Sequence, residues 1–232
     1  MTQLGSILHT ISYMALPLLL AMVFHEYAHG KVADYFGDRT AREAGRLTLN
    51  PLAHIDLFGT ILLPLLCLIF PTGVFIGYAK PVPINAVNFR NPRREMAIVA
   101  AAGPMMNLVL AIVSAALLTG IMILDPTVAD SISTRGTAIP RSDLAGMILV
   151  PLAWMCMYSV LINLVLMVFN LIPIPPLDGS TLLWRFLPPQ LVWQWRPILT
   201  QYGFIILLLF IFTIGQYVFR IVLNVTTFLV GG

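Results

Sequence analysis

Long, nearly continuous runs of apolar residues limit the fold of this chain more than any other feature of its sequence. Four of them cover residues 7–28, 96–124, 144–171 and 202–230. A helix rises ~1.5 Å per residue, so each run is long enough to cross a hydrocarbon core of ~30 Å. Apolar and polar residues do not alternate in these runs as they do in barrel strands. With 59% hydrophobic and only 10% charged residues, the chain is expected to be an all-α polytopic membrane protein with about four spanning helices.

The basic residues between the runs predict which side of the membrane each run faces. They gather in two stretches, residues 31–46 and 80–94. By the positive-inside rule both stretches are cytoplasmic. Residues 57–79 lie between them and are interrupted by Pro64 and Pro71, so this segment makes no net crossing. We expect a re-entrant hairpin here, with two short crossings as the alternative, in a multi-pass protein of the cell membrane.

A short stretch after the first run has the period of a β-strand. In GRLTLN, residues 45–50, polar side chains alternate with Leu47 and Leu49, and Gly45 and Pro51 bound the stretch. Alternation between two such breakers predicts a short membrane-associated β-strand or hairpin.

The remaining segments complete one predicted domain. Residues 125–143 contain few basic residues and are expected outside the cell. Residues 180–197 mix tryptophan and arginine, which is typical of a helix at the membrane interface. No soluble domain is recognised. We therefore expect one integral membrane domain over 1–232, with a core at 7–179 and a C-terminal part, an interfacial helix and the last spanning helix, at 180–230.

The end of the first run contains the most informative motif, FHEYAHG at residues 24–30. The pattern HExxH in a helix places two imidazoles on one face, where both can bind one Zn²⁺, and puts a glutamate beside them as a general base. Here these residues are His25, Glu26 and His29. At this composition roughly one chain in a thousand would contain the motif by chance. The alternative is a helix end whose polar side chains simply meet water.

A third metal ligand is needed, because a hydrolytic zinc site usually has three protein ligands and one position open for water. His54 and Asp178 are the candidates at the same membrane depth. Asp178 lies in NLIPIPPLDG, residues 170–179, where three prolines interrupt the helix and a carboxylate can turn inward. An aspartate after a proline run is more often a turn residue, but the nearby motif favours Asp178. His54 is expected to be a loop residue.

Two motifs together resemble a known family. HEYAH at 25–29 and NLIPIPPLDG at 170–179 are similar to the paired signatures HExxH and NxxPxxxLDG of the site-2 proteases, which are intramembrane zinc metalloproteases. GPMMN at 103–107 is similar to a third element of that core. The resemblance covers essentially the whole chain.

The resemblance implies a function and a site. One Zn²⁺ per chain would be bound by His25, His29 and Asp178. Glu26 would activate the zinc-bound water, and Asn170 would orient the scissile peptide or stabilise its oxyanion. Similarity to family elements that receive substrate suggests a further set of substrate-binding residues: Arg46, Leu47, Thr48, Leu49, Asn50, Lys80 and Asn107.

The resemblance also implies partners. The chain looks like the compact prokaryotic subgroup without a PDZ domain. Its expected substrates are single-span membrane proteins, such as tethered regulators or remnant signal peptides, cut within or next to their transmembrane segment on the cytoplasmic side of the bilayer. Such cleavage would serve regulated intramembrane proteolysis or the clearance of membrane peptides. Nucleic acid is not an expected partner, because the basic residues are scattered without interleaved aromatic residues.

Two functions from other classes stay open. In a metal-ion transporter the same three ligands would form a transit site between broken helices; this predicts metal flux, but it gives no role to Glu26 and no internal repeat is visible. A proteolytically inactive member of the family could act as a membrane scaffold, although the intact ligands and base argue against this.

Overall fold

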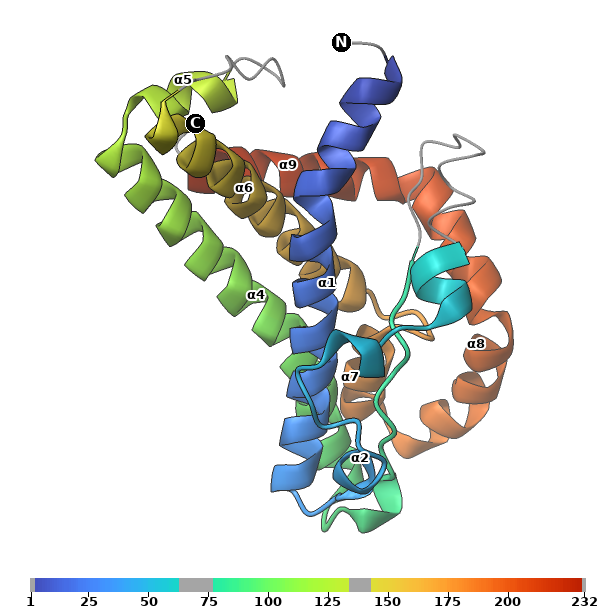
Figure 1. The fold of residues 1–232 in the computed structure, drawn as a ribbon. Coiled ribbons are helices and arrows are strands. Elements are labelled where there is room, and N and C mark those ends of the chain that lie inside the picture. Colours follow the sequence, from blue (N-terminus) through green and yellow to red (C-terminus); the bar gives the residue numbers. More distant parts are fainter. Residues whose placement is uncertain (1–2, 63–76, 134–142, 231–232) are drawn as a thin grey trace. The chain divides into compact units, whose positions relative to one another are not determined.

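The computed structural model of the chain describes residues 3–62, 77–133 and 143–230. Over these residues it contains helices and no strand. Four helical stretches are long and apolar enough to cross a membrane (Figure 1). They cover Thr10–Tyr35, Pro92–Leu124, Leu144–Asn170 and Pro189–Val230. They correspond to the four runs expected from the sequence, so the described residues have the all-α fold with four long apolar helices that the sequence predicted.

The long helices begin and end where the sequence provides signals. They are α1 (Gln3–Tyr35), α4 (Pro92–Leu124), α6 (Leu144–Asn170), α8 (Pro189–Phe210) and α9 (Gln216–Val230), and α8 continues through a π-helical turn, η4 (Ile211–Gly215), into α9. Proline is the first residue of α4 and of α8, a position where its missing N–H costs no hydrogen bond. The Asn91 side chain accepts a hydrogen bond from Arg94 N at 3.3 Å and so caps the start of α4.

Shorter helices connect the long ones. They are α2 (Thr40–Glu43), η1 (Pro51–Ala53), η2 (Leu57–Leu62), η3 (Ala86–Asn88), α5 (Thr127–Ser133) and α7 (Asp178–Phe186). Residues 180–197, expected as one interfacial helix, are divided between α7 and α8. Leu187 and Pro188 have extended backbones between them, because a residue that precedes proline is disfavoured in the helical region.

The chain packs into two compact units. The bundle unit comprises Met1–Ala21, Asn107–Leu166 and Phe212–Gly232, and the motif unit comprises Met22–Met106 and Met167–Ile211. In the bundle unit, α4 and α6 contribute most of one apolar cluster. Its buried members are Leu118, Ile121, Val128, Val150, Ala153, Trp154 and Cys156.

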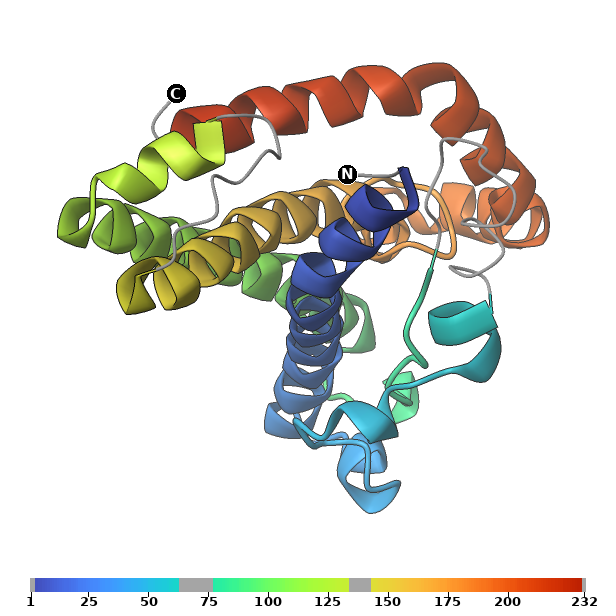
Figure 2. The same cartoon turned by 45° about the horizontal axis from the view of Figure 1, so that its top comes forward.

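The motif unit has its own core beside the end of α1. Ala33 of α1, Val99 of α4 and Phe89 after η3 are buried against one another, so this cluster joins three segments that are distant in the sequence. Figure 2 shows the light-blue end of α1 and α2 next to the green segment that contains η3. The cluster fixes the part of α1 that contains the HEYAH motif against the first turns of α4.

A buried carboxylate completes this junction. Asp38 is 0% exposed and accepts hydrogen bonds from Thr40 N, Thr40 Oγ1, Asn85 N at 2.7 Å and Asn88 Nδ2 at 2.7 Å. Burial alone would raise the pKa of Asp38, but these hydrogen bonds outweigh it and lower the pKa below its ordinary value. The ionised side chain therefore ties the end of α1 to the segment around η3.

The predicted β-strand at residues 45–50 is wrong, because these residues form a turn, bends and irregular backbone and no strand. Local side-chain hydrogen bonds take the place of a strand ladder. Thr48 Oγ1 accepts from Asn50 N at 3.1 Å, and Asn50 Oδ1 accepts from Leu52 N at 3.1 Å. Threonine and asparagine compete in this way with regular structure, which the alternating pattern alone does not reveal.

The predicted re-entrant segment is described only at its two ends. Tyr78 N donates to Gly59 O at 3.0 Å, and Thr60 Oγ1 donates to Tyr78 O at 2.9 Å. Residues on either side of the segment therefore lie next to each other. The path between them, over residues 63–76, lies outside the described residues, and the re-entrant hairpin stays a prediction.

Candidate metal centre

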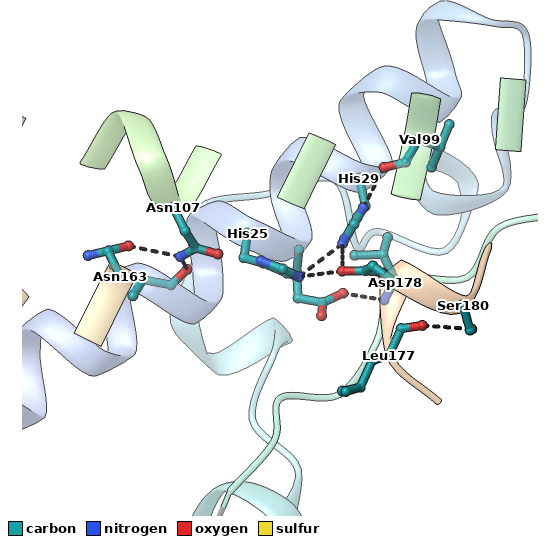
Figure 3. A network of polar contacts seen from close by, with 11 residues as sticks. His25, His29, Val99, Asn107, Asn163, Leu177, Asp178 and Ser180 are labelled. Carbon is teal, nitrogen blue, oxygen red and sulfur yellow. Dashed lines mark hydrogen bonds and ion pairs between the residues drawn. The ribbon is translucent and has the colours of Figure 1, made fainter. Parts of the chain in front are cut away.

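Three predicted ligands meet in the motif unit (Figure 3). His25 and His29 lie on one face of α1, and their Nε2 atoms are 3.0 Å apart. Asp178, the first residue of α7, places its Oδ2 3.2 Å from His25 Nε2 and 3.3 Å from His29 Nε2. Within the described part of the chain, this is the one group of histidine, cysteine or acidic residues with the spacing of a metal site.

The turn before α7 brings Asp178 to the histidines. The chain folds back so tightly after α6 that a Cβ on Gly179 would lie 2.2 Å from Leu171 O, so only glycine fits there. Ser180 Oγ donates to Leu177 O at 2.7 Å. Asp178 therefore stands at the N-terminal end of a helix, where the partial positive charge of the helix favours a carboxylate.

The other end of α7 is fixed as well. The Arg93 guanidinium, at the start of α4, donates to Trp184 O at 3.1 Å and to Leu187 O. These carbonyls belong to the last turn of α7 and to its C-terminal cap, where the helix itself provides no donor. Arg93 thus ties the helix that contains Asp178 to α4.

A hydrogen bond sets the orientation of one imidazole. His29 Nδ1 lies 2.7 Å from Val99 O, and because a carbonyl can only accept, Nδ1 carries the proton. In the neutral ring the lone pair is then on Nε2, which faces His25 and Asp178. A histidine ligand held by a backbone carbonyl on its far nitrogen is the usual arrangement around bound metals.

One of the three facing atoms, Asp178 Oδ2, is not matched by a hydrogen bond. His25 and His29 are 8% and 6% exposed, and Asp178 Oδ2 is buried without a hydrogen bond of acceptable geometry. Burial raises the pKa of the Asp178 carboxyl, but its contacts with His25 and His29 outweigh burial and lower the pKa to about 2. A buried, ionised carboxylate oxygen without a hydrogen bond is stabilised by a bound cation.

Zinc fits this set of atoms. Two ligands at ~2.0–2.1 Å from a tetrahedral Zn²⁺ lie about 3.3 Å apart, and the three separations observed here are 3.0, 3.2 and 3.3 Å. Two histidines and one carboxylate also form a common ligand set of catalytic zinc.

Gly103 of α4 provides the space beside the imidazoles. A Cβ at this position would lie 2.3 Å from His29 Nε2 and 2.6 Å from His25 Nε2. Any side chain on Gly103 would therefore occupy the place where a metal and its fourth ligand belong.

Glu26 is held by a loop and not by the histidines. Its Oε2 accepts a hydrogen bond from Val82 N at 2.8 Å. Arg46 Nη2 donates to Lys80 O at 2.9 Å and to Pro81 O at 3.4 Å. Arg46 and Lys80 were both predicted to contact substrate. In this structure the Arg46 side chain binds the backbone of the segment that contains Lys80.

The other predicted residues lie elsewhere. His54 is 2% exposed, and its Nε2 lies 2.8 Å from Thr48 O, so it is the loop residue that the sequence suggested. Asn107 is fully buried and donates to Asn163 Oδ1 at 2.8 Å. Asn170 is the half-buried last residue of α6. The bends at 46–50 leave the predicted substrate contacts of Leu47, Thr48, Leu49 and Asn50 untested.

Three contributors to the site could not be assigned from the sequence. Val99 and Val82 act through their backbones, and almost any side chain at those positions would leave the same carbonyl or N–H. For Gly103 a signal existed, since glycine precedes proline inside an apolar helix, but its distance from the histidines required the fold.

Comparisons with known proteins place these features in context. The model of peptidase family M50 matches residues 13–210. The chain is 37% identical over 223 residues to "Putative zinc metalloprotease YwhC" of Bacillus subtilis, covering 94% of this chain and 88% of that protein. It is 29% identical over 195 residues to "Putative zinc metalloprotease Rip2" of Mycolicibacterium smegmatis, covering 84% of this chain and 64% of that protein. No solved structure gives a significant match.

Proposed function

Because the chain belongs to peptidase family M50, the site-2 protease family, and is a membrane metalloprotease, we propose that it hydrolyses a peptide bond within or next to the transmembrane segment of single-span membrane proteins. One Zn²⁺ is held by His25, His29 and Asp178. The observation that carries this proposal is the convergence of three ligand atoms, one each from His25, His29 and Asp178, all within 4.8 Å of one another.

The residues divide the chemistry between them. Zinc, when bound, supplies a Lewis acid that polarises the scissile carbonyl and makes a coordinated water acidic near pH ~7. Glu26 takes a proton from the attacking water and delivers it to the leaving amine. Asn170 donates a hydrogen bond to the developing oxyanion. Val99 O keeps His29 Nε2 available as a ligand by holding the proton on Nδ1.

The proposed substrates approach from the cytoplasmic side of the cell membrane. The basic stretches 31–46 and 80–94 both follow the motif in the sequence and support this orientation through the positive-inside rule. Two hydrogen bonds between the ends of residues 57–79 support the re-entrant course of that segment. Tethered regulators and remnant signal peptides are the proposed substrate classes, and Arg46–Asn50, Lys80 and Asn107 are the proposed contacts.

Cleavage of a tagged single-span peptide by purified protein in detergent tests this function. Wild type is expected to produce product and to contain one zinc per chain. Glu26→Gln should keep the zinc and lose cleavage, whereas His25→Ala should lose both. Cleavage by Glu26→Gln at the wild-type rate would contradict the mechanism. Zinc flux into sealed vesicles without any cleavage would favour a transporter.

A further inference from the structure

The segment Lys80–Pro83 lies against α1 and uses every backbone donor that it has. Lys80 N donates to His54 O at 2.9 Å, and Val82 N donates to Glu26 Oε2 at 2.8 Å. Pro81 and Pro83 have no N–H. The N–H of Lys80 therefore anchors the segment, and the N–H of Val82 donates to the glutamate of the motif.

The segment is fixed from its other side by Arg46. The guanidinium Nη2 donates to Lys80 O and Pro81 O, the two carbonyls that precede Val82. The Arg46 backbone is itself anchored, because its N donates to Ala41 O at 2.8 Å. Arg46 thus determines where the Val82 amide points without touching Glu26.

The Val82 side chain is packed as well. It is 6% exposed, and its Cγ1 lies 3.2 Å from the place where a Cβ on Gly30 would be. Glycine at position 30, one residue after the HEYAH motif, therefore lets Val82 approach α1 closely. A segment anchored by three hydrogen bonds and a buried side chain is built to stay in place, which argues against a latch that releases Glu26.

We propose that the backbone N–H of Val82 holds the Glu26 carboxylate in position for proton transfer, and that Arg46 is the positioning residue that keeps this N–H in place. The inference rests on the proposed function, in which Glu26 is the general base. A glutamate has several rotatable bonds, and a base that is displaced by ~1 Å can lose about 100-fold in rate. With Oε2 held by Val82, Oε1 is the oxygen that takes the proton from water.

Val82→Pro tests the proposal because it removes this one donor. We expect kcat to fall by about 10- to 100-fold while KM and the zinc content stay at wild-type values. Val82→Ala keeps the N–H and should lose far less. Val87→Pro is the matched control: it removes an exposed amide that donates to the Asn85 side chain and should leave kcat unchanged.

Arg46 gives a graded series. Arg46→Gln should lower kcat in the same direction as Val82→Pro, again without loss of zinc, because both carbonyl contacts lose their charged donor. Arg46→Lys retains a donor and should recover part of the rate. A purely structural role would instead lower the yield of folded protein and the zinc content together.

An NMR measurement tests the proposal without relying on enzyme activity or on whether Val82→Pro folds. The dipeptide Pro–Val occurs once in the sequence, at Pro81–Val82, so labelling the proline carbonyl with ¹³C and the valine nitrogen with ¹⁵N yields a single amide resonance. We expect Glu26→Gln to move it upfield, since the proton loses a charged acceptor, and Arg46→Gln to move it too. Glu43→Gln, at an exposed glutamate, is the control.

The outcomes separate cleanly. An unmoved Val82 resonance in Glu26→Gln, or wild-type kcat in Val82→Pro, overturns the positioning role. Wild-type protein that cleaves no peptide contradicts the proposed function instead, and the resonance still decides whether Val82 holds Glu26.

Discussion

Two buried polar clusters, one in each unit, differ in whether their hydrogen-bonding groups are matched. In the bundle unit, Asn107 donates to Asn163 at 2.8 Å, Asn163 donates to Ser159 O at 2.9 Å, and Ser159 and Ser114 share a hydrogen bond of 2.7 Å. In the motif unit, the Nε2 atoms of both histidines and Asp178 Oδ2 converge within 3.3 Å of one another, and the buried Oδ2 has no hydrogen bond of acceptable geometry.

The difference shows how a structural cluster can be told from a functional one. A neutral network of matched donors and acceptors joins helices inside the membrane at low cost. A buried carboxylate oxygen without a hydrogen-bond donor destabilises the fold unless a cation binds it. The cluster of Asn107, Asn163, Ser159 and Ser114 is matched within itself, whereas the histidine cluster contains a buried oxygen that the proposed zinc would bind.

The largest expected effect comes from filling the space beside the histidines. Gly103→Ala places a methyl group 2.3 Å from His29 Nε2 and should weaken zinc affinity by at least about 100-fold, with loss of cleavage. Gly120→Ala, in the same helix but with nothing within 4 Å, should bind zinc normally. Competition with a chromogenic chelator measures both. Equal affinity in the two variants would mean that α4 does not border the metal.

A smaller effect is expected from disrupting the hydrogen-bonded cluster of Asn107, Asn163, Ser159 and Ser114. Asn163→Ala removes the Asn163 Oδ1 acceptor of the buried Asn107 side chain and should lower the free energy of unfolding by about 1–3 kcal/mol. Zinc content per folded chain should not change. Thermal unfolding in detergent, combined with metal analysis, checks both statements. Loss of zinc in this variant would break the distinction between the two clusters.

Arg93 should affect the histidine cluster through α7. Arg93→Gln removes the charged donor from Trp184 O and Leu187 O, loosens the helix that positions Asp178, and should weaken zinc binding about tenfold. Arg94→Gln, at the exposed neighbouring position, serves as the control. Competition with a chelator measures the zinc affinity of both variants. A larger loss of affinity in Arg94→Gln than in Arg93→Gln would contradict a role for Arg93.

The smallest effect concerns Asp38, a carboxylate that is fully matched, in contrast to Asp178. Its pKa in the folded chain is lowered below the ordinary 3.8, so its stabilisation is complete above about pH 4 and is lost as the pH falls through the folded-state pKa. Asp38→Asn should cost about 1 kcal/mol at pH 7 and nothing once wild-type Asp38 is protonated. Denaturation of both proteins across this range measures the difference, and a constant difference would refute the assignment.

The sequence predicted the long apolar helices correctly but did not predict the structure of the short segments between them. The apolar runs predicted α1, α4, α6 and the α8–α9 stretch, because a membrane demands long apolar helices whatever their neighbours are. The strand at 45–50 was wrong, since Thr48 and Asn50 satisfy the backbone locally. Hydrogen bonds between neighbouring residues therefore outweigh the strand preference of a short alternating pattern.

The sequence alone predicted the chemistry of this protein. HEYAH fixes two imidazoles on one helix face through helical periodicity, and the resemblance of HEYAH and NLIPIPPLDG to the paired signatures of a protease family implied roles for Glu26, Asp178 and zinc. Only the tertiary structure decided how these groups are held. Val99 O, the space at Gly103 and the Val82 N–H act through backbone atoms or through a missing side chain, so their effect depends on which segments pack together and not on the residue types that a sequence displays.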